Sequence, residues 1–378
     1  MSATSRMTPW VTVGVAAVLW FFPILQEGLD LPVFYLLFAY SLFFWIAQAS
    51  AWNMFTGYSG YFSFGQGAFF GVGVYAVATL AVKRGWPLFP TFVIGGLAAA
   101  ILGLIIGFVT FRLRKLRGEI FALMTLAVAF VMGALARVSP AIDGGQGVPV
   151  NQVDPPTFLG SFPVMIFRLG LIVATIAVVT AQVLQRSRLG WGLFAIRDDE
   201  DVAETLGVPT FAFKLAALGI STFVAGLSGA VHSLQIGYVT IEDVFNIRVP
   251  LLVILMSILG GTQRWTGPVL GAVIVYTLND RLNRAGLEDV SDLIVGALLI
   301  FMVVAVKEGL AARMRDRAAA TAIGMVAGLV VAIVTGGLAE SAVTALAYML
   351  AGAVLGAMIP SGRRRSSHEP ADEGLVDA

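Results

Sequence analysis

The chain has 378 residues, of which 58% are hydrophobic and 12% are charged, and its formal net charge at pH 7 is +1. This composition is too apolar for an ordinary soluble domain and indicates a polytopic membrane protein. There is no cysteine, and the two histidines, His232 and His368, lie far apart in the sequence. The sequence therefore excludes disulfides and cysteine chemistry. It predicts no catalytic residue, no metal site, no cofactor bound by this chain and no nucleic-acid partner.

Apolar runs that approach the length of a bilayer crossing, roughly 20 residues, recur along the chain. In the main body they cover residues 10–25, 31–52, 60–82, 88–111, 118–138, 163–185, 211–236, 248–263, 266–282 and 289–306, and two more follow at 318–337 and 341–360. They predict an all-α polytopic transmembrane helical bundle with about ten core spans in residues 1–310. An added C-terminal hydrophobic hairpin is predicted in 311–362, and a polar disordered tail in 363–378.

Lysine and arginine cluster between these runs, around residues 112–117, 186–214, 307–317 and 363–365. Such clusters are typical of cytoplasmic loops. The pattern predicts a multi-pass protein in the lipid bilayer whose two termini both lie in the cytoplasm.

Ionisable residues are nearly absent from the middles of the predicted spans, and the chain has no GxxxxGK[ST] phosphate loop. Proton- and ion-coupled carriers usually need charged relay residues within the membrane. The sequence therefore indicates no ion-coupled mechanism and no ATP hydrolysis by the chain itself.

The stretch NMFTGYSGYFSFGQGAFFGVGVYAVATL, residues 53–80, is deeply hydrophobic yet repeatedly interrupted by glycine. Membrane segments tolerate irregular backbone only inside protein or along a polar cavity, which favours a pathway-lining element. The alternative is that the small residues only let helices pack closely. The candidates for the translocation path are Thr56, Gly57, Tyr58, Ser59, Gly60, Ser63, Gly65, Gln66 and Gly67.

Residues 186–209, RSRLGWGLFAIRDDEDVAETLGVP, form a charged segment between two predicted spans. Their apolar positions suit short helices, Asp198 or Asp199 can cap a helix start, and Gly207-Val208-Pro209 can end one. This segment is either a compact knob offered to a partner or a solvated loop.

Further along the chain, Gly260-Gly261 and Gly267-Pro268 bracket a short polar segment between two predicted spans. Proline is well accommodated in the first turn of a helix, where its missing N–H costs nothing. These residues predict a tight structural turn of a helical hairpin.

As an ordered set, these blocks resemble the branched-chain amino-acid ABC transporter permease family, M-type subunit. RSRLGWGLFAIRDDEDVAETLGV is similar to its coupling loop and TGYSGYFSFGQGAFFGVGVYA to its glycine-rich early span. LRGEIFALMTLA, DGGQGV, AGLSGAVHSLQIGYV and ILGGTQRWTGPVLGA resemble further family blocks in the family's order. The resemblance covers roughly residues 30–310, whereas the two runs after residue 317 depart from it.

The resemblance implies a permease subunit of an importer in a bacterial plasma membrane, and not an enzyme. The implied partners are a related permease subunit, two cytoplasmic ATPase subunits that use ATP, an external solute-binding protein and a small amino-acid substrate. It also implies a docking role for the external turn at residues 143–147. The implied ATPase-coupling residues are Arg197, Asp198, Asp199, Glu200, Ala203, Glu204 and Gly207.

The sequence leaves two alternatives open. One is an importer of urea or short amides on the same scaffold. The other, from a different class, is a self-contained passive facilitator in which the segment 186–209 is only a connection.

Overall fold

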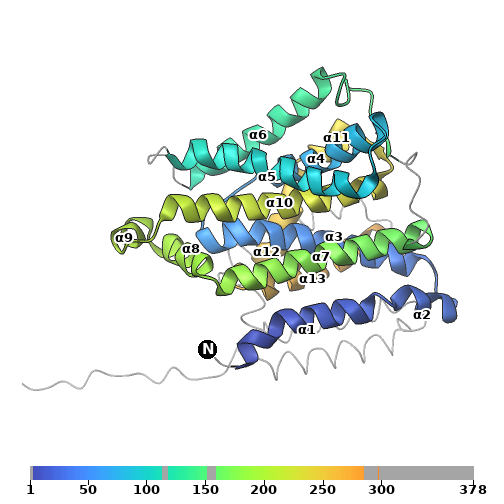
Figure 1. Cartoon of the computed structure of the whole chain (residues 1–378), viewed down its shortest axis with the longest axis horizontal. Coiled ribbons are helices and arrows are strands. Elements are labelled where there is room, and N and C mark those ends of the chain that lie inside the picture. Colours follow the sequence, from blue (N-terminus) through green and yellow to red (C-terminus); the bar gives the residue numbers. More distant parts are fainter. Residues whose placement is uncertain (1–2, 113–117, 151–158, 285–296, 298–378) are drawn as a thin grey trace, which may run out of the picture. The chain divides into compact units, whose positions relative to one another are not determined.

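The computed structural model describes residues 3–112, 118–150, 159–284 and 297, which all belong to one unit, Met1–Ala312. The described residues are mostly helical and include one short pair of strands (Figure 1). In chain order the elements are α1 (Ala3–Leu19), α2 (Phe22–Gly28), α3 (Phe34–Trp52), the π-helix η1 (Asn53–Gly57), α4 (Gln66–Val77), the π-helix η2 (Ala78–Lys83), α5 (Leu88–Arg112), α6 (Glu119–Val138), β1 (Val148–Pro149), α7 (Phe162–Arg186), α8 (Arg188–Asp198), α9 (Glu200–Thr205), α10 (Thr210–Ile236), β2 (Tyr238–Val239), α11 (Ile241–Val244), α12 (Arg248–Gly260) and α13 (Thr266–Arg284).

Helices dominate because lipid offers no hydrogen-bond partner, so a spanning segment must pair its own backbone groups. The described part of the chain has eight helical segments long and apolar enough to cross a membrane: Pro9–Gly28, Phe34–Gly57, Gln66–Lys83, Leu88–Arg112, Glu119–Val138, Phe162–Arg186, Thr210–Ile236 and Ile241–Gly260. The predicted all-α polytopic bundle is confirmed.

The start of the third predicted span is not helical. Residues 60–65 form a connection instead, because Gly60 has a φ of +76° and side chains take the place of helical partners. The indole Nε1 of Trp52 donates to the Ser63 backbone oxygen at 2.7 Å, and the Phe64 N–H donates to Thr125 Oγ1 at 3.0 Å.

At the other end of the described chain, α13 forms where the run 266–282 predicts a span. It is not among the eight apolar segments, and its last turns contain Asp280 and Arg284, which form an ion pair at 2.9 Å. The predicted span at 289–306, the hairpin at 311–362 and the tail at 363–378 lie outside the described residues, apart from residue 297.

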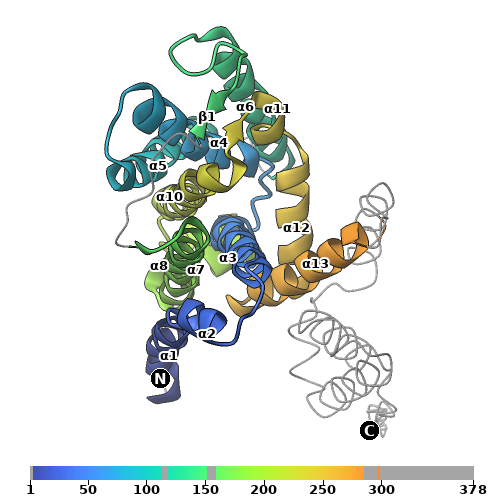
Figure 2. The same ribbon diagram turned by 90° about the vertical axis from the view of Figure 1, so that its right-hand side faces the viewer.

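Helix α10 is central: it contacts α4 and α5 on one side and α3 and α7 on the other (Figures 1 and 2). The closest approach uses glycine. A Cβ atom added to Gly73 of α4 would overlap the Gly226 backbone oxygen of α10, and one added to Gly229 would overlap the Phe70 backbone oxygen. Gly73 of the glycine-rich stretch and the facing glycines of α10 therefore serve close helix packing, the second interpretation that the sequence offers.

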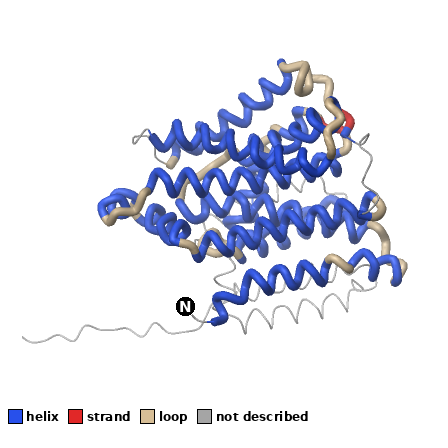
Figure 3. Tube along the Cα trace, viewed as in Figure 1, coloured by secondary structure: helices blue, strands red, loops and turns tan. Residues whose placement is uncertain are grey.

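The short elements gather at two opposite ends of the bundle (Figures 1 and 3). Helices α8 and α9 lie at one end, here called the α8–α9 end. The antiparallel strands β1 and β2, with Val148 opposite Val239, lie at the other, the β1–β2 end. Figure 2 looks along α3, α7 and α10 and shows α12 crossing the view.

Candidate functional site

Residues 186–209 fold into the two expected short helices. The Ser187 hydroxyl oxygen accepts from the Gly190 N–H at 3.1 Å and caps α8. The Asp199 carboxylate accepts from the N–H groups of Asp201 and Val202, both at 3.0 Å, and caps α9. Gly207, with a φ of +85°, lets the chain turn away after α9.

One face of this α8–α9 unit is packed and the other is open. Leu193, Ile196 and Ala203 are buried against the bundle. In contrast, Trp191 is 69% exposed and Leu206 is 79% exposed. Exposed apolar side chains mark protein contact sites where they form a contiguous patch.

Arg197 joins this unit to two other parts of the chain. Its Nη1 donates to the Gly57 backbone oxygen at 2.6 Å and lies 3.4 Å from Thr262 Oγ1. A Cβ added to Gly60 would lie 3.1 Å from the Arg197 Cγ. The guanidinium group therefore links α8 to the end of η1 and to the α12–α13 turn, and glycine at position 60 gives it room.

Glu200, at the start of α9, forms a second and more buried link. Lys214 Nζ of α10 lies 2.5 Å from Glu200 Oε1, with the lysine side chain 5% and the glutamate side chain 17% exposed. The Tyr61 hydroxyl donates to the other Glu200 carboxylate oxygen and accepts from Lys214 Nζ at 3.2 Å. The ammonium also lies 5.0 Å from the centre of the Phe111 ring.

The structure brings some of the predicted coupling residues together and leaves others at the surface. Arg197 and Glu200 contact the bundle, and Asp199 and Gly207 shape the unit. Asp198 and Glu204 are exposed, whereas Ala203 is buried beneath them. Sequence reasoning missed Tyr61 as a partner, although a lone lysine in an apolar run, Lys214, is a signal for a nearby acidic group.

The predicted path candidates occupy the stretch that leads from η1 to α4, next to the α8–α9 unit, and most of their polar side chains are used internally. Ser59 Oγ donates to the Phe55 backbone oxygen at 2.8 Å. Ser63 Oγ accepts from the Gly65 N–H at 3.2 Å. The Gln66 Nε2 group donates to Gln48 Oε1 at 2.5 Å, tying α4 to α3.

Most of the remaining candidates are buried as well, whereas Gly60 is exposed. The Tyr58 hydroxyl lies 3.4 Å from the Ala181 backbone oxygen of α7. Thr56 and Gly57 belong to η1, and a Cβ on Gly67 would meet the Pro250 ring at 3.3 Å.

The turn at residues 260–268 is a backbone-to-backbone crossing of α12 and α13. A Cβ added to Gly260 would overlap the Gly267 backbone oxygen, and one added to Gly267 would overlap the Gly261 oxygen. Gln185 holds the turn against α7, because its Nε2 donates to the Gln263 oxygen at 3.2 Å and its Oε1 accepts from the Trp265 N–H at 3.1 Å. Pro268 lies in the first turn of α13.

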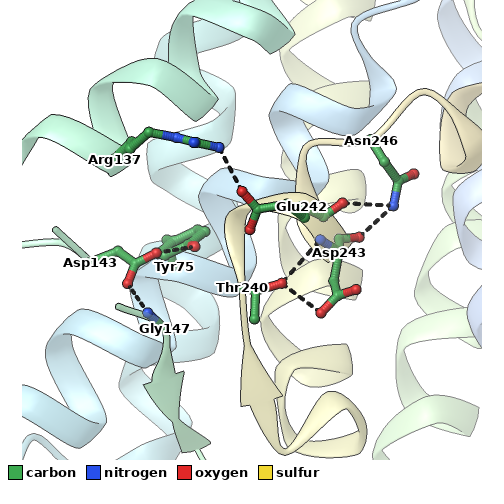
Figure 4. A network of polar contacts seen from close by, with 8 residues as sticks. All are labelled: Tyr75, Arg137, Asp143, Gly147, Thr240, Glu242, Asp243 and Asn246. Atoms are coloured by element: carbon green, nitrogen blue, oxygen red, sulfur yellow. Dashed lines mark hydrogen bonds and ion pairs between the residues drawn. The ribbon is translucent and has the colours of Figure 1, made fainter. Parts of the chain in front are cut away.

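At the β1–β2 end, polar contacts order the predicted glycine turn (Figure 4). The Asp143 carboxylate accepts from the Tyr75 hydroxyl at 2.9 Å and from the Gly147 N–H at 2.5 Å. Gly147 has a φ of +76°, so this turn requires glycine. The Gly147 N–H group therefore already has a hydrogen-bond acceptor within the chain, so it is not available to a docked protein.

A second part of this network holds the short helix α11 in place. Arg137 pairs with Glu242 at 2.6 Å, and the Thr240 hydroxyl accepts from the Asp243 N–H at 3.2 Å to cap the helix. The Asn246 Nδ2 group donates to the backbone oxygens of Glu242 and Asp243 (Figure 4).

Within the described ranges, no group of three histidine, cysteine, aspartate or glutamate side chains lies close enough to hold an ion. His232 is packed inside the bundle, where its Nδ1 lies 2.9 Å from the Tyr40 hydroxyl and its ring stacks on Phe44 at 3.9 Å.

Comparison with known proteins identifies the family of this chain. The family described as "Branched-chain amino acid transport system / permease component" matches residues 34–303. The chain is 24% identical to the high-affinity branched-chain amino acid transport system permease protein LivM of Escherichia coli (strain K12), over 79% of this chain and 73% of LivM. The Salmonella typhimurium LivM is also 24% identical, over 78% of this chain and 72% of that protein.

A more distant relative is the autoinducer 2 import system permease protein LsrC of Salmonella paratyphi B. It is 26% identical over 49% of this chain and 54% of LsrC. No solved structure matches the chain. Because the family match spans most of the sequence, including the α8–α9 unit and the glycine-rich stretch, the chain belongs to the branched-chain amino acid transport system permease family and is a multi-pass membrane protein.

Proposed function

We propose that this chain is the transmembrane permease subunit of an ATP-driven importer for branched-chain or related hydrophobic amino acids. Separate ATPase subunits hydrolyse ATP, and a related permease subunit and an external binding protein complete the transporter. The similarity to LivM, a branched-chain amino acid permease by its name, supports the substrate class.

The observation that carries the coupling proposal is the position of the α8–α9 unit. Its exposed face offers Trp191 and Leu206 to a partner, while its inner side holds the bundle through Arg197 and Glu200. A displacement of the unit by an ATPase would therefore act directly on Gly57 at the end of η1 and on Lys214 of α10. A mere connecting loop needs neither contact.

This proposal also sets the orientation. The α8–α9 end faces the cytoplasm, where the lysine and arginine residues of the charged segment 186–214 agree with the positive-inside rule. The β1–β2 end then faces outward, toward the binding protein.

The test is uptake into vesicles by the complex reconstituted with the products of neighbouring genes, comparing labelled leucine with labelled urea under mutual competition. Leucine uptake that needs both ATP and binding protein is the expected result. Uptake of urea instead would keep the mechanism and contradict the substrate. Uptake by this chain alone, without ATP, would replace the importer with a facilitator.

A further inference from the structure

The last turns of α3 and the π-helix η1 contain buried polar side chains that form no hydrogen bond among the described residues. The unpartnered atoms are Ser50 Oγ and Thr56 Oγ1, and the Asn53 amide, which lies between them in the sequence, interacts with the Tyr58 hydroxyl. All three residues are at least nine-tenths buried. Spaced three residues apart, they follow one another along successive turns and form what we call the η1 polar stripe.

Several other buried hydroxyl groups of the described bundle are satisfied by their own helix, whereas Thr277 Oγ1 of α13 has no partner among the described residues. Thr110 Oγ1 donates to the Ile106 oxygen at 2.7 Å, and Thr222 Oγ1 donates to the Leu218 oxygen at 2.9 Å. Helical serine and threonine commonly use this backbone partner, and buried polar groups without any partner are rare and need an explanation. Ser50 and Thr56 therefore belong, with Thr277, to the few buried hydroxyl groups of the described residues that have no partner.

The surroundings of the stripe point to a closed pathway. The Tyr58 hydroxyl interacts with the Asn53 side chain and also lies 3.4 Å from the Ala181 backbone oxygen of α7. A Cβ on Gly57 would lie 2.8 Å from the Thr262 backbone oxygen, so η1 packs directly on the α12–α13 turn. The Gly57 carbonyl at the end of the stripe accepts from Arg197 of the α8–α9 unit. π-Helical turns often occur at functional positions.

We propose that the η1 polar stripe is the substrate-contacting surface of the inner half of the pathway. In the present arrangement its polar groups are buried. Breaking the Arg197–Gly57 hydrogen bond would allow η1 to move and expose these groups to the substrate. Hydroxyl and amide groups donate and accept, so they suit the ammonium and carboxylate groups of a small zwitterionic solute without the tight retention that a buried charge causes. This inference rests on the proposed function and assigns its contact residues.

The chain lends itself to a direct test, because it has no native cysteine. Ser50→Cys, Asn53→Cys and Thr56→Cys are made singly in the full complex and treated with 2-aminoethyl methanethiosulfonate in inverted membrane vesicles. Thr222→Cys is the matched control, equally buried but with a hydroxyl that is satisfied in the native chain. We expect ATP-dependent labelling of the stripe, slowed by leucine, and no labelling of the control. Labelling equal to the control, or unaffected by leucine, would overturn the assignment.

A second measurement separates transport from folding. Ser50→Ala and Thr56→Val remove hydroxyls that have no partner in the closed state, so the melting temperature should stay constant or rise while the KM for leucine uptake increases several-fold. Thr222→Val should instead lower the melting temperature and leave KM unchanged. If the wild-type complex imports leucine but KM is unaltered in both stripe variants, the stripe assignment fails while the proposed function stands.

Discussion

At the scale of single residues, the Lys214–Glu200 pair is the most consequential contact in the α8–α9 unit. Both side chains are largely removed from solvent, and the Tyr61 hydroxyl satisfies both partners at once. Removing one member of a buried ion pair leaves an uncompensated charge, which typically costs about 3–5 kcal/mol. This ion pair therefore stabilises the packing of α9 against α10.

We predict that Lys214→Met lowers the stability of the purified protein by about 3–5 kcal/mol, because it leaves the largely buried Glu200 carboxyl group without its cationic partner. Thermal unfolding in detergent measures this as a clear drop in melting temperature. The double variant Lys214→Met/Glu200→Leu should recover part of the loss, since neither charge then remains buried.

The chain provides its own reference for this experiment in the Arg137–Glu242 pair, whose side chains are 61% and 69% exposed. Glu242→Gln should change stability by at most about 1 kcal/mol, as is usual for solvent-exposed pairs. Equal melting temperatures for Lys214→Met and Glu242→Gln would show that the buried Lys214–Glu200 pair contributes no more to stability than the exposed pair does.

At the scale of helices, the crossing of α12 and α13 depends on glycine. A Cβ added to Gly271 of α13 would overlap the Met256 backbone oxygen of α12, and backbone cannot move aside as a flexible side chain can. We predict that Gly271→Ala destabilises the protein by about 1–3 kcal/mol or more through overpacking, measured by thermal unfolding.

Gly14 of α1 is the matched control, because a Cβ there meets nothing within 4 Å. Gly14→Ala should be neutral or stabilise the helix by up to about 1 kcal/mol, since alanine restricts the unfolded chain. The two substitutions are chemically the same, so opposite signs of their effects isolate the crossing. An unchanged melting temperature in Gly271→Ala would contradict the prediction that the α12–α13 crossing requires glycine at this position.

The sequence predicts most of the helices, and the two short helices of the α8–α9 unit, because the signals that define them are local. The cap at Asp199 and the turn at Gly207 are set by a few neighbouring residues. Residues 60–65 were predicted as helix because they are apolar, and the prediction is wrong because Trp52 and Thr125, from other elements, supply side-chain hydrogen bonds to that backbone.

The links that make up the candidate site are much harder to predict. Arg197 bonds to Gly57 across 140 positions of sequence, and Tyr61 bonds to Glu200 across 139. Such pairs are decided by how the helices pack, and neither periodicity nor capping carries that information. The assignments of individual coupling and path residues remain predictions for the experiments described above.

At the scale of the whole molecule, the proposed function makes the exposed face of the α8–α9 unit the contact surface for an ATPase subunit. Leu206→Ser removes apolar contact area at a position that packs against little in the isolated chain, so stability should change by no more than about 0.5 kcal/mol. We predict that leucine-stimulated ATP hydrolysis by the assembled complex falls about tenfold at subsaturating ATPase subunit, as for an interface residue worth roughly 1.4 kcal/mol.

Leu206→Met, which keeps the apolar surface, is the control and should retain stimulation. Glu204→Lys on the same face should also reduce stimulation while membrane insertion stays intact. Full stimulation in both Leu206→Ser and Glu204→Lys would place the ATPase contact elsewhere.

The strands β1 and β2 hold the opposite end of the bundle. Their pairing, extended by the Val150 N–H bonded to the Gly237 oxygen at 2.7 Å, ties the connection after α6 to the connection after α10. These two helix ends cannot separate there without breaking backbone hydrogen bonds. If the α8–α9 unit moves, the atomic displacements should then be smallest near Tyr238 in the paired strands. They should be larger at the opposite end of the bundle, where Gly57 contacts the α8–α9 unit.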